Sequence, residues 1–273
     1  MTVLPPDTPL SQSPDWSSRI EPPSLSAAVG LIVLYFLLQA VASGLIALLM
    51  GLGTGFVQIE RGIQPIGGEI RAMLGHPGMP AILVMLTLGV AAAVIVPLVR
   101  GKWPALWSLS RPPGLGMVMP VNPALFVLAV AVGVTAPLLG GLLTSVLANG
   151  KTVTQDVQNL GMHTPFGLRI ALVVAVTSIG PLVEEILFRG ILLSALMKRW
   201  QIGWSVAISS LLFAVSHLPS MQWQWYALPD LMLLASALAW LRLRAGSLWP
   251  AVLAHGVNNL LAVVAWFVTA GSA

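Results

Sequence analysis

Long apolar runs separated by short polar stretches dominate the pattern of this chain. A helix that crosses the hydrocarbon core of a bilayer needs roughly 20 mostly apolar residues. The fifth and sixth runs are shorter than this, so the pattern allows six to eight spans around a count of about seven. We therefore predict an all-α, polytopic transmembrane helix bundle. The seven runs lie near Ser26–Met50, Met79–Val99, Pro123–Ala148, Phe166–Met197, Ile202–His217, Leu228–Leu241 and Ser247–Thr269.

The breaks between these runs suggest three parts. Residues 1–23 are polar and proline-rich and lack the basic start of a signal peptide, so we expect a disordered tail. Residues 24–160 hold the N-terminal transmembrane helices. Residues 166–268 hold the remaining spans and, as argued below, the candidate chemistry. Tryptophans gather near the ends of the runs, as in the aromatic belts of membrane proteins.

Composition supports the membrane assignment. Charged residues make up 8% of the chain and hydrophobic ones 57%, whereas soluble domains carry roughly 25% charged residues. The formal net charge is +4, but the basic residues stand mostly between apolar runs. This placement is typical of topology signals and contacts with anionic lipid, and it does not favour nucleic acid as a partner. The chain has no cysteine, which excludes disulfides and thiolate chemistry.

The basic residues also predict an orientation. With seven spans, the N-terminus lies on the side of the membrane that carries more of the basic residues. We place that side, and with it the N-terminus, in the cytoplasm. The protein is then a multi-pass integral membrane protein, in the cell membrane if the cell is prokaryotic. The richer side holds Arg19, Arg100, Lys102, Arg111, Lys198, Arg199, Arg242 and Arg244, and the other side holds Arg61, Arg71, Lys151 and Arg169.

Two adjacent acidic residues, Glu184 and Glu185, lie deep within the fourth run. A carboxylate at membrane depth is costly and usually faces the protein interior for a functional reason. Glu185 and Arg189 stand four residues apart on one helix face in the favourable acid-before-base order, so they can pair. Glu184 is rotated about 100° from Glu185 and has no such partner. We therefore expect Glu185 to be structural and Glu184 to be free for chemistry, with Pro181 disturbing the helix one turn earlier.

Other spans add polar groups at a similar depth. His217 ends the fifth run, one turn after Phe213, and His255 lies in the seventh run, one turn before Asn259. We measured depth along the helices from the same predicted face of the membrane. The depths fall within a band of roughly 10 Å for Glu184, His217, His255 and Asn259. We therefore predict that they share one polar cavity.

One carboxylate, two imidazoles and a carboxamide suffice for hydrolysis. Glu184 or a histidine takes a proton from water, and a histidine or Asn259 donates to the developing oxyanion. The alternative is a zinc ion held by Glu184, His217 and His255, which would lower the pKa of its bound water. No HExxH motif signals zinc. A metal would also leave no free carboxylate as base, because Glu185 is committed to Arg189, so we favour no cofactor.

These residues resemble the three motifs of the CPBP family of intramembrane proteases, which contains the type II CAAX prenyl endopeptidases and bacteriocin-immunity proteins. The family motif EExxxR is similar to Glu184-Glu185-Ile-Leu-Phe-Arg189, FxxxH to Phe213-Ala-Val-Ser-His217, and HxxxN to His255-Gly-Val-Asn-Asn259. All three occur in order on separate predicted helices within residues 166–268. Apart from their membrane-spanning runs, the first 165 residues show no feature that is typical of the family.

The resemblance implies an intramembrane endopeptidase that acts on a membrane-associated peptide or protein, lipidated or not. It implies that Glu184 is the general base, helped by His217, and that His255 and Asn259 stabilise the oxyanion. Glu185, Arg189 and Phe213 would support the site. Family members have been described as metalloproteases and as metal-free glutamic proteases, and the metal-free type fits these residues better.

Two other classes of function remain as alternatives. One is a non-catalytic membrane scaffold or immunity protein that keeps the fold. The other is an ion-coupled transporter, because intramembrane Glu and His also occur in proton relays. Transporters often show repeated halves, and no repeat is visible in this sequence.

Overall fold

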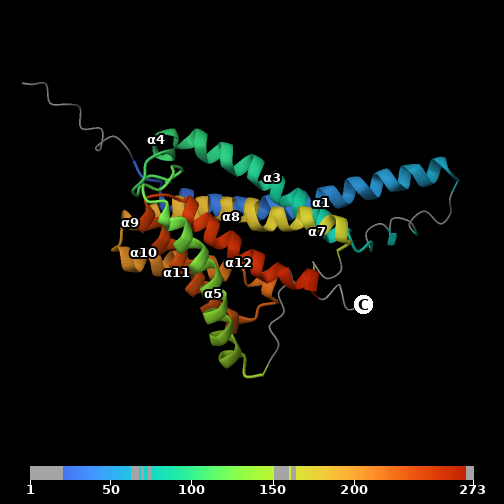
Figure 1. Ribbon diagram of the computed structural model, residues 1–273. Coiled ribbons are helices and arrows are strands. Elements are labelled where there is room, and N and C mark those ends of the chain that lie inside the picture. The colour runs from blue at the N-terminus through green and yellow to red at the C-terminus, as the bar shows by residue number, and fades with distance from the viewer. Residues whose placement is uncertain are drawn as a thin grey trace, which may run out of the picture.

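The computed structural model describes residues 21–62, 68, 71–72, 75–150, 160 and 164–268, and the side chains of the last five of these are not described. The predicted tail, apart from residues 21–23, lies outside the described residues, as do Arg19 and Lys151. The described residues form helices joined by turns, and the prediction of an all-α bundle is confirmed (Figure 1).

All seven apolar runs are helical. The helices in chain order are α1 (Leu25–Glu60), α3 (Met79–Lys102), α4 (Pro104–Trp107), α5 (Ala124–Ala148), α7 (Phe166–Val174), η2 (Ala175–Ile179), α8 (Gly180–Glu185), η3 (Ile186–Leu192), α9 (Leu193–Met197), α10 (Ile202–Ser216), η4 (Pro219–Met221), η5 (Trp225–Ala227), α11 (Leu228–Ala245) and α12 (Trp249–Val268).

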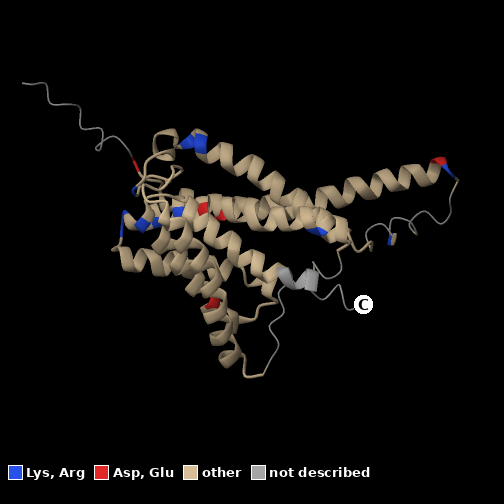
Figure 2. Cartoon of the chain, viewed as in Figure 1, with Lys and Arg blue, Asp and Glu red and all other residues tan. Residues whose placement is uncertain are grey.

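Five helical segments in the described part of the chain are long and apolar enough to cross a membrane. Helix α10 has 15 residues and is shorter than a typical span. Figure 2 shows that charged residues gather mainly at helix ends, apart from an acidic group inside the bundle. The chain is therefore an integral membrane protein. The five segments are Leu25–Glu60, Met79–Lys102, Ala124–Ala148, Phe166–Met197 and Trp225–Ala245.

Helix α1 runs ten residues further than the sequence pattern predicts. It begins at an N-cap, where the hydroxyl of Ser24 accepts a hydrogen bond from the backbone N–H of Ala27 at 3.1 Å. Its 36 residues correspond to about 54 Å, which exceeds the roughly 30 Å of a bilayer core. The first half packs against α3, and the second half extends away from the other helices (Figure 1).

The packing brings two groups of helices together. Residues of α1, α3, η3 and α10 form the largest buried cluster, and α5, α11 and α12 form another. Small residues let helices approach closely within a membrane. A Cβ added to Gly133 of α5 would lie 2.5 Å from the carbonyl oxygen of Ala254 on α12, so glycine is needed at this crossing.

A buried arginine fixes the start of α12. Arg242, which has no exposed surface, donates to the carbonyl oxygens of Ser110 at 2.7 Å and Gly114 at 2.6 Å. The backbone N–H of Leu248 donates to the carbonyl of Gly116 in the same loop at 2.8 Å. This loop therefore lies beside the end of α11 and holds the turn that leads into the helix carrying His255.

Candidate active site

The helix that carries both glutamates has an unusual winding. Between Phe166 and Met197 the chain passes through two π-helical segments, η2 and η3, which flank the short α-helix α8. Glu184 and Glu185 are the last two residues of α8. The sequence predicted a disturbance at Pro181, and the structure shows a widened helix without a break. Single π-helical turns occur frequently at functional sites.

Glu185 is the centre of a buried charged cluster. Its Oε1 atom lies 2.8 Å from the Nη1 atom of Arg189 and 2.9 Å from the Nδ1 atom of His255. Arg189 also donates to the carbonyl of Ala235 at 3.2 Å, and its guanidinium lies 4.4 Å from the centre of the Phe213 ring. Glu185 and Arg189 are almost completely buried. The expected ion pair is therefore present, and His255 joins it.

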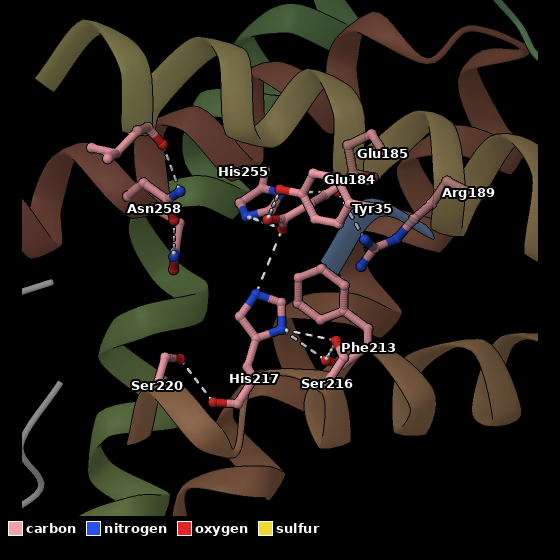
Figure 3. A network of polar contacts seen from close by, with 12 residues as sticks. Tyr35, Glu184, Glu185, Arg189, Phe213, Ser216, His217, Ser220, His255 and Asn258 are labelled. Atoms are coloured by element: carbon pink, nitrogen blue, oxygen red, sulfur yellow. Dashed lines mark hydrogen bonds and ion pairs between the residues drawn. The ribbon is translucent and has the colours of Figure 1, made fainter. Parts of the chain in front are cut away.

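Glu184 faces a different set of groups (Figure 3). Its Oε2 atom lies 3.6 Å from the Nε2 atom of His217 and 3.8 Å from the Nε2 atom of His255. Its Oε1 atom accepts a hydrogen bond from the hydroxyl of Tyr35 at 3.2 Å. The Glu184 side chain is 14% exposed, whereas that of Glu185 is fully buried. The structure thus brings Glu184, His217 and His255 together from three separate helical regions.

The hydrogen bonds on the far sides of both imidazoles orient their rings. The Nδ1 atom of His217 lies 2.8 Å from the carbonyl oxygen of Phe213, and the Nδ1 atom of His255 lies beside the carboxylate of Glu185. Both partners accept hydrogen bonds, so each Nδ1 atom carries a proton. In the neutral rings the Nε2 atoms are then acceptors, and both face the Oε2 atom of Glu184. The site therefore gathers three groups that can accept a proton from water.

Asn259 contacts the π-helical segment η2. In this segment the backbone N–H of Gly180 bonds to the carbonyl of Ala175, five residues earlier. The next bond of this kind would join residue 181 to Val176, but Pro181 has no N–H to donate. The Nδ2 atom of Asn259 donates to the Val176 carbonyl instead, at 2.9 Å. The side chain that the sequence assigned to the oxyanion thus also satisfies a backbone group left by the proline.

Close packing makes this contact between α12 and η2 feasible. A Cβ added to Gly256 would collide with the carbonyl oxygen of Thr177, so only glycine allows this approach. The Nδ2 atom of Asn258 donates to the Oδ1 atom of Asn259 at 3.2 Å, which orients the Asn259 carboxamide. Asn259 has two N–H groups on Nδ2, so one remains for another acceptor.

The donor types around Glu184 are those that zinc prefers, but their spacing is wider. Zinc ligands at about 2.1 Å in a tetrahedron stand about 3.4 Å apart. The two separations from the Glu184 oxygen are 3.6 and 3.8 Å. Among the described residues, no group of three or more His, Cys, Asp or Glu side chains is placed to hold a metal ion. In this arrangement the three side chains do not fit a zinc ion.

An apolar cavity lies beside the helix that carries Glu184. Its volume is about 580 Å³, and its lining includes Thr177, Ser178 and Leu182 of that helix. Helix α12 contributes Val252, one turn before His255. The cavity therefore adjoins the two helices that supply the carboxylate and one imidazole.

Tyr35 is the site residue that sequence reasoning missed. It lies in the first apolar run, 149 residues from Glu184, and is almost completely buried. The available signal was weak: Tyr35 is one of two tyrosines in the chain and stands within a run of aliphatic residues. A buried tyrosine hydroxyl usually has a hydrogen-bond partner, but the sequence does not reveal which one.

Comparison with known proteins agrees with these motifs. Residues 166–261 match the family model described as type II CAAX prenyl endopeptidase Rce1-like. No curated protein and no solved structure matches the chain. The matched segment includes Glu184, Glu185, Arg189, Phe213, His217, His255 and Asn259, and the resemblance to the CPBP family is confirmed. The segment from Phe166 to Leu261 is therefore similar to the Rce1-like type II CAAX prenyl endopeptidases.

Proposed function

We propose that this protein is an intramembrane endopeptidase that hydrolyses a peptide bond of a membrane-associated substrate with water activated by Glu184 and His217. One observation carries the proposal. The partly exposed carboxylate of Glu184 faces the Nε2 atoms of His217 and His255 at 3.6 and 3.8 Å, within a segment that matches an endopeptidase family. The buried Glu185 cluster behind it fixes one of the two imidazoles.

The proposed reaction begins with a proton transfer from water. Glu184 accepts the proton while the Nε2 atom of His217 orients the water, and the oxygen adds to the scissile carbonyl carbon. The carbonyl oxygen becomes an oxyanion. Glu184 then passes the proton to the leaving nitrogen as the carbon–nitrogen bond breaks. The carboxylate returns to its starting state, and the products are a carboxylic acid and an amine.

His255 and Asn259 are proposed to stabilise the oxyanion. This role requires His255 in the state with a proton on both ring nitrogens, instead of the neutral ring. Glu184, Glu185 and Arg189 together carry a charge of −1 when ionised, so a protonated His255 makes the cluster neutral. Its Nδ1–H would then bond to Glu185 while its Nε2–H points toward the reacting carbonyl. The second N–H on the Nδ2 atom of Asn259 supplies another donor. Donors fixed before the reaction are worth most in a site that excludes water.

The surroundings of the site support a substrate that is itself in the membrane. The cavity beside Leu182 and Val252 has an almost entirely apolar lining and can accept an apolar segment or chain. We also propose that the N-terminus is cytoplasmic, because the predicted sides differ in Lys and Arg content. The cytoplasmic orientation predicts that a tag at the N-terminus stays protected from protease in sealed right-side-out vesicles.

The test is cleavage of a library of membrane-associated peptides, with and without lipid groups, by the purified full-length protein. Glu184→Gln should abolish cleavage. Glu60→Gln is the matched control, because Glu60 is an exposed glutamate at the end of α1. Equal cleavage by the wild type and by Glu184→Gln would refute the proposed base. Retained function in cells with no cleavage by either protein would favour the scaffold or immunity alternative.

A further inference from the structure

The N-terminal helix α1 contributes a side chain to the candidate site although it lies outside the family match. The hydroxyl of Tyr35 donates to the Oε1 atom of Glu184 at 3.2 Å. The other carboxylate oxygen, Oε2, faces His217 and His255. Figure 3 shows Tyr35 and His217 approaching Glu184 from different sides. The two oxygens of one carboxylate thus have different partners.

The packing of α1 holds Tyr35 in this position. Ala28, Leu31 and Tyr35 follow each other at intervals of three and four residues, so they share one helix face. All three are buried in the same cluster as Ile186 and Leu187, which directly follow the two glutamates. The position of the hydroxyl is therefore set by the core of the bundle.

A second polar side chain of α1 lies near the hydroxyl. Gln39 stands one turn after Tyr35 on the same helix face, so its amide can reach the Tyr35 hydroxyl. When the Gln39 amide donates to the phenolic oxygen, the phenolic proton remains for Glu184. Gln39, Tyr35 and Glu184 then form a chain of hydrogen bonds that runs from α1 into the site.

The terminal torsion of a glutamate is soft, so a carboxylate without a fixed partner turns over a broad range. The two imidazoles lie too far from Oε2 for strong hydrogen bonds, at 3.6 and 3.8 Å. The hydrogen bond from the Tyr35 hydroxyl is thus the shortest polar contact of the Glu184 carboxylate among the interactions described.

We propose that Tyr35 is a positioning residue that holds the Glu184 carboxylate with Oε2 facing His217 and His255. The inference rests on the proposed function, in which Glu184 is the base. It implies that the family-matched segment does not contain the whole site, because α1 completes it. Tyr35 acts through Glu184 and need not touch the substrate.

The test compares Tyr35→Phe with the wild type in the full-length protein. Loss of one hydrogen bond to a charged group should lower kcat about 10- to 100-fold. KM should not change, and Tm should fall by only a few degrees, because phenylalanine keeps the packing and only the hydrogen bond is lost. Gln39→Leu should lower kcat by a smaller factor in the same direction. Tyr226→Phe, which removes the hydroxyl of the chain's other tyrosine, is the matched control and should retain full activity.

A spectroscopic measurement separates this proposal from the proposed function. The infrared difference spectrum between the wild type and Glu184→Gln isolates the stretching band of the Glu184 carboxyl group. Tyr35→Phe should move that band even if no substrate is cleaved, and Tyr226→Phe should not. An unmoved band, an unchanged kcat, or a rise in KM alone would each overturn the positioning role. If the wild type cleaves nothing but Tyr35→Phe still moves the Glu184 band, the proposed function is refuted and the contact between Tyr35 and Glu184 stands.

Discussion

Replacing each of the two adjacent glutamates by glutamine should have opposite consequences. Glu185 is fully buried, and its Oε1 atom accepts from both Arg189 and His255. Glu185→Gln keeps the shape but removes the charge that neutralises Arg189. Breaking a buried ion pair costs about 3–5 kcal/mol, and a remaining hydrogen bond to the glutamine oxygen returns about 1 kcal/mol. We therefore expect a loss of about 2–4 kcal/mol in stability.

Glu184→Gln should barely affect stability. The side chain is partly exposed, and the glutamine oxygen can still accept the Tyr35 hydrogen bond. Its separations from His217 and His255 are long, so loss of the charge should cost no more than about 1 kcal/mol. Turnover should nevertheless fall by a factor of about 100 to 10,000, because the general base is lost.

Thermal unfolding of the detergent-purified proteins measures the difference. The ten tryptophans provide an intrinsic fluorescence signal. With about 2–4 °C of Tm per kcal/mol for a protein of this size range, Glu185→Gln should lower Tm by about 5–15 °C and Glu184→Gln by less than about 4 °C. The reasoning is refuted if Glu184→Gln lowers Tm more than Glu185→Gln does.

A double substitution tests whether the unpaired arginine causes the loss. Arg189→Met in the Glu185→Gln background removes the second charge and keeps an apolar side chain of similar length. Replacing both partners of a buried pair is often far less costly than removing one. The double variant should therefore have a higher Tm than Glu185→Gln alone. A lower Tm would mean that the ion pair is not the source of the instability.

Three further outcomes follow from the contacts of α12 and from the metal-free mechanism. Gly256→Ala should lower the stability by about 1–3 kcal/mol in thermal unfolding, because its Cβ meets the backbone of Thr177. Gly141→Ala, where no atom lies within 4 Å of the new Cβ, should have no such effect. Asn259→Asp should reduce both Tm and kcat, because an acceptor would then face the Val176 carbonyl. Exhaustive chelation should leave peptide cleavage unchanged; stoichiometric zinc whose removal stops turnover and whose return restores it would contradict the metal-free mechanism.

The helices and the ion pair between Glu185 and Arg189 could be predicted from the sequence for physical reasons. Apolar runs near membrane length can only bury their backbone groups as helices in lipid. Glu185 and Arg189 are four residues apart, and this spacing brings them together in a helix whatever the tertiary structure. The structure contains both features.

The contacts between helices that are distant in the sequence could not be predicted from it. The pairing of Tyr35 with Glu184 and of His255 with Glu185 depends on which faces of three helices meet, and apolar runs do not specify this. The π-helical segments were also missed, because an α- or π-helical winding of the run from Phe166 to Met197 has the same hydrophobic pattern. Depth along each helix predicted that Glu184, His217 and His255 could meet, but not which atoms would face each other.

Asn259 makes a structural contact that explains how the third motif, His255 to Asn259, is held in place. A backbone carbonyl without a donor is costly in a low-dielectric interior, and Pro181 creates one at Val176. Asn259 on α12 satisfies it, and Gly256 allows the two backbones to approach closely enough. This contact fixes α12 against the helix of the glutamates. His255, one turn before Asn259, is thereby placed where one nitrogen reaches Glu185 and the other faces Glu184. A role in binding the oxyanion alone would not explain why α12 is held in this position along the helix of the glutamates.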